Sequence, residues 1–160
     1  IHYSVMFYGG RLLSHLTLED ADNELIKLLR INRNAIVIID RDGINSSTKI
    51  NETKTRIQNE TSEGNCWITK GREIENYLAE ETVLKYLATY AKDLKFKYDK
   101  NKKLGDNILK SNKKLKLNYD ANKTKFSKEI VGHITENDLS VLDLKTRMKH
   151  VISQIGIWNK

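Results

Sequence analysis

The segment Ala35–Gly43, with the sequence AIVIIDRDG, constrains the fold more than any other part of the chain. Four consecutive apolar residues, Ile36–Ile39, lead directly into Asp40, Arg41 and Asp42. A short run of β-branched residues bounded by polar turn residues predicts a strand buried on both faces, as in a parallel sheet. The aspartates then follow the carboxyl end of the strand, and this edge is where open α/β sheets bind ligands.

Asp40 and Asp42 stand two residues apart, so both side chains can turn into the same crevice. Two carboxylates at this spacing repel each other unless a cation lies between them. Mg²⁺ or Mn²⁺, hard ions that prefer oxygen ligands, would fill that role. The residues alone leave a plainer alternative open, an aspartate-rich turn after a core strand, because Asp and Gly both suit turns.

A second acidic segment follows the next predicted strand, Asn65–Thr69. After Lys70 and Gly71 the chain reads REIENYL, which places Glu73 and Glu75 just beyond the strand end. These glutamates would share a rim of the sheet with the two aspartates, and four converging carboxylates favour a metal site. Taken alone, the glutamates are better explained as acids in the first turn of a helix, where the macrodipole favours them.

The remaining pattern predicts an α/β chain with a soft boundary near residue 80. An α/β core would occupy residues 1–79 and a helical part residues 80–160. Turn signals and apolar periodicity predict a strand at His2–Tyr8 and a helix from Thr17 to about Arg30. A second helix would run from a cap at Ser46–Thr48 to about Glu60, with Ile50 and Ile57 buried. Further helices are predicted over Glu80–Ala91 and Asp120–Ile134, and from Leu144 to near Gly156. The opening β-α-β order normally means parallel strands joined by a right-handed crossover.

The charge is uneven along the chain, which carries a formal net charge of +7. Lysines interleaved with aromatic residues crowd the segment that follows the helix at Glu80–Ala91, and the candidate nucleic-acid contacts are Lys95, Lys97, Lys100, Lys102, Lys103, Lys113, Lys114 and Lys116. A binder of the phosphate backbone needs such a patch because neutralised phosphates release counterions. A solvated lysine-rich face explains the same residues equally well.

The composition also bounds the setting of the protein. No apolar run is long enough for a transmembrane span, and no signal peptide is recognisable, so no membrane partner is expected. The single cysteine, Cys66, has no internal partner and stands in an apolar context. We therefore expect it to be a core filler in a reducing, cytoplasmic protein.

Three motifs in order carry a resemblance to a known family. The apolar strand with DRDG, the strand followed by KGREIENYL, and the helix opened by NKTKF at Asn122–Phe126 resemble the Toprim domain of OLD-family nucleases. These bacterial and phage proteins fuse an ABC-type ATPase to a C-terminal Toprim domain. The resemblance covers nearly the whole chain and implies a Toprim-like, Rossmannoid, mostly parallel sheet with flanking helices, followed by a helical C-terminal part.

The resemblance implies a metal-dependent nuclease that cuts or nicks DNA. Asp40 and Asp42 match the family's DxD pair, and Glu75 matches the glutamate of its (K/R)xIENYL stretch, with Glu73 as a secondary metal ligand. The implied cofactor is Mg²⁺ or Mn²⁺. Two such ions about 4 Å apart clamp the attacking and leaving oxygens in phosphodiester hydrolysis.

Further roles follow from the same resemblance. Lys123 matches the lysine before the late helix, where its charge would stabilise the pentavalent phosphate, and Lys125 is its rival. The basic segment Lys92–Lys116 would position DNA without reading its sequence. The other implied partners are an upstream ATPase domain or chain and further copies of the full-length protein, and the implied biological role is defence against phage.

One departure from the family concerns the start of the chain. The family's first-strand glutamate is missing, because the sequence begins at Ile1 in what would be the second strand. We expect the chain to be an excised piece of a longer protein. A preceding segment or another chain would then supply the missing ligand, or this piece is inactive by itself.

Two other readings compete with the nuclease. A phosphatase of the haloacid dehalogenase type also begins with an apolar strand and DxD, but Ile44 stands where that family places a hydroxyl residue, and Gly105-Asp106 is the nearest substitute for its late paired acids. The other alternative is a catalytically inactive Toprim-like module that binds nucleic acid or a partner chain through its lysines.

Overall fold

The computed structural model describes residues 2–5, 34–43, 47–62, 64–92, 94, 96–111 and 119–160. The chain divides into two compact units, each built from segments that are discontinuous in sequence. The sheet unit comprises Ile1–Ile39, Lys49–Ile68 and Thr146–Lys160, and the helical unit comprises Asp40–Thr48 and Thr69–Lys145. Both acidic segments predicted from the sequence belong to the helical unit.

Two parallel strands form the centre of the sheet unit. Strand β1 spans Val37–Ile39 and pairs with β2, Cys66–Ile68, so that Val37 lies opposite Cys66 and Ile39 opposite Ile68. Helix α3, Glu52–Glu60, connects them in the β-α-β order that parallel strands require. The predicted α/β class with parallel pairing is confirmed at this level.

A small apolar cluster holds α3 against the strands. Ile57, Cys66 and Ile68 are buried together, and Val37, Ile39 and Ile50 pack against them. The predicted burial of Ile57 on α3 and of Cys66 is therefore confirmed, whereas Ile50 precedes the helix and is only partly buried. The predicted cap at Ser46–Thr48 is wrong, because the Asn51 side chain accepts a hydrogen bond from Lys54 N at 2.9 Å.

The two strands differ in burial. All three residues of β2 are buried, with Trp67 only 3% exposed. In β1, Val37 and Ile39 pack on the cluster, whereas Ile38 is 52% exposed. The prediction that β1 is buried on both faces is therefore wrong. Side chains alternate along a strand, so the residue between the two that face the cluster points the other way.

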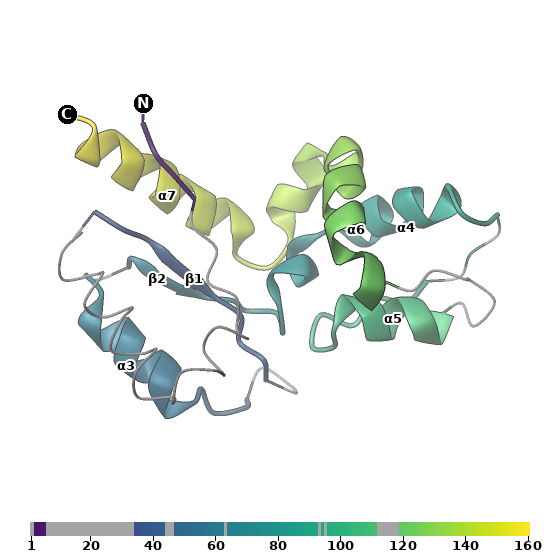
Figure 1. Ribbon diagram of the computed structural model, residues 1–160, viewed down its shortest axis with the longest axis horizontal. Coiled ribbons are helices and arrows are strands. Elements are labelled where there is room, and N and C mark those ends of the chain that lie inside the picture. The colour runs from purple at the N-terminus through teal and green to yellow at the C-terminus, as the bar shows by residue number, and fades with distance from the viewer. Residues whose placement is uncertain are drawn as a thin grey trace. The chain divides into compact units, whose positions relative to one another are not determined.

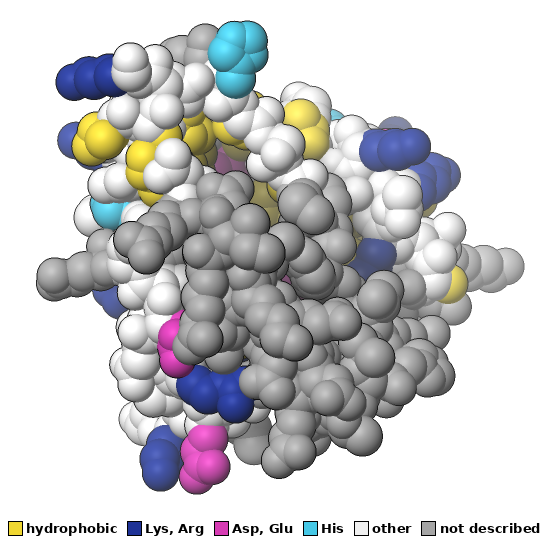
Figure 2. All heavy atoms as spheres, turned by 60° about the vertical axis from the view of Figure 1, so that its left-hand side comes forward, with side chains coloured by type: hydrophobic (Ala, Val, Ile, Leu, Met, Phe, Trp, Pro, Cys, Tyr) yellow, Lys and Arg dark blue, Asp and Glu magenta, His cyan; other side chains and the backbone are white. Residues whose placement is uncertain are grey.

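Helix α7, Leu144–Trp158, completes the sheet unit, and Figure 1 shows it on the opposite side of the strand pair from α3. His150 Nε2 lies 3.0 Å from Asn65 Oδ1, which links α7 to the residue before β2. The predicted final helix is confirmed and continues two residues beyond Gly156. Met148, Ile152 and Ile157 are exposed on this helix. Figure 2 shows hydrophobic side chains at the surface near the top of the view.

The helical unit contains most of the helices in the described residues. Its elements are η1 (Ile74–Tyr77), α4 (Glu80–Ala88), α5 (Leu104–Ser111), η2 (Asp120–Asn122), α6 (Lys123–Ile130), η3 (Val131–His133) and η4 (Glu136–Ser140). The predicted helices at Glu80–Ala91 and Asp120–Ile134 are confirmed in kind. The second one is α-helical only at α6, between the short helices η2 and η3.

Aromatic side chains dominate the core of the helical unit. The buried cluster is Val83, Tyr86, Leu87, Phe96, Leu104, Ile108, Tyr119, Phe126 and Ile130. The Phe126 ring meets Tyr86 and Tyr119 edge-on, with centroids 4.9 and 5.0 Å away. Edge-to-face packing of this kind adds to the free energy gained from burial. This core joins α4 to α6 and fixes the position of Tyr119.

Two predicted elements fall wholly or partly outside the described residues. Of the predicted strand at His2–Tyr8, the structure describes His2–Val5, and this piece is not part of a strand. The predicted helix from Thr17 to about Arg30 lies outside the described residues. Within the described ranges, no helix combines the length and the apolar character needed to cross a membrane.

Candidate functional site

The REIENYL segment, Arg72–Leu78, is built into the helical unit by buried hydrogen bonds. Asn76 is fully buried, and its Oδ1 accepts from Glu73 N while its Nδ2 donates to Lys102 O, each at 2.9 Å. The Tyr77 hydroxyl donates to Asp143 Oδ1 at 2.6 Å. These bonds satisfy polar groups that would otherwise be buried without partners, so they fix the backbone from which Glu73 and Glu75 project.

The DRD turn, Asp40–Asp42, lies against the residues that follow β2. Asp40 Oδ1 accepts from Ile74 N at 2.7 Å. Arg41 N donates to Thr69 Oγ1, and Asp42 N donates to Arg72 O, each at 2.8 Å. The structure therefore brings the two predicted acidic segments together, as expected for segments that leave neighbouring parallel strands.

The two aspartates of the DRD turn differ in setting. Asp40 is half-buried and its carboxylate bonds to the REIENYL segment. Asp42 is exposed and has a φ of 58°, in the left-handed region. Asp is among the few residues other than Gly that adopt this conformation with little strain. The backbone thus reverses at Asp42, directly before the buried Gly43.

Glu73 is buried and structurally engaged. Its side chain is 6% exposed, and Oε1 accepts from Leu104 N, at the start of α5, at 2.7 Å. Burial raises the pKa of Glu73, the Leu104 N–H lowers it, Glu75 and Asp40 raise it, and Lys123 lowers it. The three carboxylates and the lysine therefore lie close enough to influence one another's charge.

Glu75 faces the start of α6. Its Oε1 lies 3.9 Å from Lys123 Nζ and accepts from the Tyr119 hydroxyl at 3.3 Å. Burial raises the pKa of Tyr119, and the charges of Glu75 and Glu73 raise it further, so the phenol stays protonated and donates. The candidate site thus contains both signs of charge, with Glu75 about a quarter exposed and Lys123 about half exposed.

The rival lysine is placed elsewhere. Lys125 Nζ lies 3.8 Å from Glu129 Oε1 and 5.9 Å from the centre of the Tyr90 ring. Glu129 also accepts from the hydroxyls of Tyr86 and Tyr90, at 3.2 and 3.0 Å. Lys125 therefore belongs to a network between α4 and α6, while Lys123 is the lysine beside Glu75.

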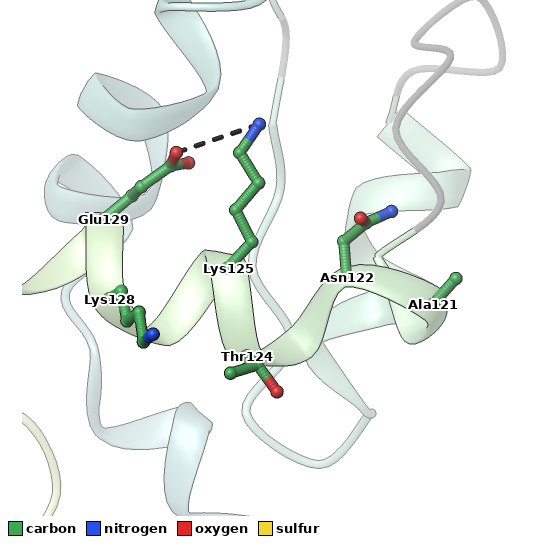
Figure 3. Close-up of a pocket in the computed structure, with 6 residues that line it drawn as sticks. All are labelled: Ala121, Asn122, Thr124, Lys125, Lys128 and Glu129. Carbon is green, nitrogen blue, oxygen red and sulfur yellow. Dashed lines mark ion pairs between the residues drawn. The ribbon is translucent and has the colours of Figure 1, made fainter.

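A shallow pocket of about 480 Å³ lies along α6 and the residues before it. Figure 3 shows its lining, which is Ala121, Asn122, Thr124, Lys125, Lys128 and Glu129. The Lys125–Glu129 ion pair crosses part of this surface, so one of its two lysines is already neutralised. Three of the six lining residues carry charged side chains and the pocket is open, which suits contact with a charged chain better than enclosure of a small molecule.

The predicted lysine patch divides into different environments. Lys97 and Lys103 are exposed, and Lys102 forms an ion pair with Asp99 at 2.9 Å. Lys100 is half-buried, with Nζ donating to Leu78 O and lying 3.6 Å from the centre of the Tyr98 ring. Burial lowers the pKa of Lys100 to about 8. The predicted contacts Lys95, Lys113, Lys114 and Lys116 lie outside the described residues.

The carboxylates do not form a ready ligand shell. Among the residues that the structure describes, no group of three or more His, Cys, Asp or Glu side chains is placed to hold a metal ion. Oxygen donors nevertheless gather here. Burial is the main cause that raises the pKa of Glu73, and the charges of Glu75 and Asp40 raise it further, a repulsion that a cation would relieve. In donor chemistry the residues fit Mg²⁺ or Mn²⁺, and ligation requires their side chains to rotate toward one another.

Sequence reasoning missed the residues that support the acidic segments. Asn76 holds the backbone of the REIENYL segment, and Tyr98 donates to Glu75 O at 2.7 Å. Tyr119 contacts the Glu75 side chain across 44 residues of sequence. Its position four residues before Lys123 was a signal for a shared helical face, but nothing in the pattern indicated the glutamate.

The comparisons with known proteins identify no related protein. No protein-family model matches the chain, and no curated protein or solved structure matches it. Any functional assignment therefore rests on the motifs and on the geometry of the helical unit.

Proposed function

We propose that this chain is the Toprim-type catalytic part of an OLD-family, ATP-dependent nuclease that cuts or nicks DNA with Mg²⁺ or Mn²⁺. The observation that carries the proposal is the grouping of Asp40, Glu73 and Glu75 around one another with Lys123 beside them. Such a cluster is costly in a protein without a ligand, because like charges held together destabilise the fold. This arrangement follows two parallel strands, which is the common location of ligand sites in α/β folds.

Asp40, Asp42 and Glu75 are the residues that would hold the ion. Asp42 is exposed, and Asp40 and Glu75 are both half-buried. Glu73 is already bound to the backbone of α5, so its role is to add negative charge and to fix the segment. A bound divalent ion supplies a Lewis acid and an activated water for phosphodiester hydrolysis.

Lys123 supplies the positive side of the site. Its side chain is about half exposed, so a phosphate oxygen can reach it from solvent. It would attract the scissile phosphate and stabilise the negative charge that builds up on it during attack. In the free protein, Glu75 holds this ammonium group near the carboxylates.

DNA and an upstream ATPase are the proposed partners. Exposed lysines at Lys97 and Lys103 would contact phosphates without reading sequence, and so would Lys128, which lines the pocket on α6. The ATPase enters the proposal through the family resemblance alone, and so does a role in defence against phage. A Toprim-like, mostly parallel sheet is part of the same proposal.

Calorimetric titration of Mn²⁺ tests the metal site directly. The 160-residue chain is compared with Asp40→Asn, which keeps the shape of the side chain and removes its charge. We expect Asp40→Asn to weaken Mn²⁺ binding at least tenfold. The matched control is Asp106→Asn, the same change at an exposed position of α5, which should bind Mn²⁺ as the wild type does.

A cleavage assay on supercoiled plasmid completes the test. Metal-dependent nicking that is lost in Asp40→Asn and kept in Asp106→Asn supports the nuclease. Equal cleavage by Asp40→Ala and wild type would remove the Toprim assignment, since the residue would then be dispensable. No Mn²⁺ binding to the wild type would also count against it.

A second candidate function is a nucleic-acid-binding module without catalysis. The observation that favours it is that the carboxylates do not converge on one point in the described structure. DNA binding that weakens steeply with salt, together with no metal-dependent cleavage, would select this function. The same plasmid assay therefore separates the two candidates.

A further inference from the structure

Tyr119 is the buried side chain that touches both signs of charge in the candidate site. It is 3% exposed, and its hydroxyl donates to Glu75 Oε1 at 3.3 Å. The Lys123 ammonium group lies 5.4 Å from the centre of its ring, within the range of a cation–π contact. Glu75 Oε1 and Lys123 Nζ are themselves 3.9 Å apart, so each of the three side chains lies near the other two.

The core fixes the Tyr119 ring from behind. Phe126 packs against it edge-on at 5.0 Å, and both belong to the buried cluster of the helical unit. A ring held in this way offers its hydroxyl from a constant position. Tyr98 gives the same kind of support to the backbone, because its hydroxyl donates to Glu75 O at 2.7 Å. Two tyrosines thus hold one glutamate, one by its main chain and one by its carboxylate.

We propose that Tyr119 is a positioning residue that orients the Glu75 carboxylate through its hydroxyl and holds Lys123 over its ring. This inference rests on the proposed function, because orientation matters only if Glu75 serves a ligand. The bond from Tyr119 occupies Oε1, so Oε2 is the oxygen left for a cation. The 3.3 Å distance is long for an O–H···O bond, and such contacts in free enzymes commonly shorten when the ligand binds.

Tyr119→Phe tests the hydroxyl while keeping the ring packed on Phe126. We expect the δ-carboxyl ¹³C resonance of Glu75 to shift, because its hydrogen-bond donor is removed. We also expect Mn²⁺ binding by calorimetry to weaken about tenfold, as is typical when a group that orients a metal ligand is lost. The ring-current shift of the Lys123 ε-protons should stay, since the ring is still present.

Tyr90→Phe is the matched control. The Tyr90 hydroxyl also donates to a glutamate, Glu129, at 3.0 Å, and this glutamate belongs to the network of Lys125. The control should leave the Glu75 resonance and the Mn²⁺ affinity unchanged. Tyr119→Leu removes the ring as well, so in that variant the Lys123 shift should disappear.

The resonances decide the inference independently of the metal. If Tyr119→Phe leaves the Glu75 resonance where it is in the wild type, Tyr119 does not position this carboxylate and the inference is overturned. Unchanged Mn²⁺ affinity in Tyr119→Phe would overturn it as well. If the wild type binds no Mn²⁺ while the Glu75 and Lys123 resonances respond as expected, the metal-dependent function fails and the contact made by Tyr119 stands.

Discussion

The DRD turn and the REIENYL segment both follow a strand and both carry acidic residues, but different contacts fix them in place. The REIENYL segment has its own supports in the helical unit, through Asn76, Tyr77 and the contact of Glu73 with α5. The DRD turn is held through Arg41 N, Asp42 N and the Asp40 carboxylate, which all bond to residues that follow β2. We call the REIENYL segment the template, because contacts within the helical unit fix it, and the DRD turn is positioned on it.

The two acidic segments of the candidate site therefore differ in how rigidly they are held. Glu73 and Asn76 are buried, so their geometry is set by packing and by satisfied hydrogen bonds. Asp42 is exposed and has no burial to restrain its side chain. An ion entering the site would therefore meet the buried REIENYL segment on one side and the more exposed DRD turn on the other. Damage to the template should disturb both segments, whereas damage to the DRD turn should stay local.

Gly71→Ala should produce the largest effect, because Gly71 directly precedes the template and packs against its Asn76 side chain. Gly71 is buried, and a Cβ added there would lie 2.5 Å from Asn76 Cβ. Neither atom is the end of a flexible side chain, so the backbone must shift. We expect the free energy of unfolding to fall by about 3 kcal/mol in urea denaturation, at the upper end of the usual cost of overpacking.

Gly132→Ala is the control for this substitution. Nothing lies within 4 Å of a Cβ placed at Gly132, on η3. Its effect on stability should stay within about 0.5 kcal/mol, as for other open surface positions. A Gly71→Ala protein as stable as Gly132→Ala would show that the turn can open, and the idea of a rigid template would have to be abandoned.

Asn76→Ala should come next in size. The change leaves Glu73 N and Lys102 O without their partners in a buried setting. We expect a loss of about 2 kcal/mol in the free energy of unfolding, because unpaired buried groups carry their full desolvation cost. Asn101→Ala, at an exposed position, should cost far less. Equal losses in the two variants would contradict the template role of Asn76.

Asp40→Ala should cost less, because it removes the bond from Ile74 N to a carboxylate that is only half-buried. We expect a loss of about 1 kcal/mol, the ordinary net value of a hydrogen bond. Asp40→Asn keeps an acceptor oxygen and relieves repulsion from Glu73, so it should unfold close to the wild type. If both variants lose the same stability, the charge and not the bond is what matters.

The sequence was sufficient to predict the strands β1 and β2, the helix between them and the meeting of the two acidic segments. Parallel strands leave the sheet at one edge, so residues after β1 and β2 must be neighbours. The same periodicity located α3, α4, α6 and α7. These features depend on local residue patterns and on the rules of strand connection, and both can be recognised in a single sequence.

The different roles of Glu73 and Glu75 were beyond such reasoning. The two glutamates stand two residues apart and look equivalent in the sequence. Glu73 is bound by Leu104 N, 31 residues later, and Glu75 meets Tyr119, 44 residues later. Only the packing of α5 and α6 on the segment decides which carboxylate is buried. For the same reason Lys100 looked like a phosphate contact, although its ammonium group bonds to Leu78 O.

Lys100 gives the template a dependence on pH. Burial lowers the pKa of Lys100 to about 8 from the ordinary value of 10.5. The unfolded chain therefore binds more protons than the folded one between these values, and the free energy of unfolding should rise as the pH increases from 7 toward 9.5. In Lys100→Met this rise should disappear. Denaturation in urea at a series of pH values measures it, and an equal slope in both proteins would exclude Lys100 as its source.

Asp42→Gly should have the smallest effect and should act in the opposite direction. The φ of 58° at Asp42 is free of strain for glycine, but glycine also makes the unfolded chain more flexible. We expect the two contributions to leave the variant more stable by about 0.5 kcal/mol or unchanged. Because Asp42 is exposed and its backbone bond to Arg72 O does not depend on its side chain, the REIENYL segment should keep its geometry. A loss of stability as large as that of Asn76→Ala would mean that the Asp42 side chain has a structural role. The DRD turn would then not be the less firmly held of the two segments.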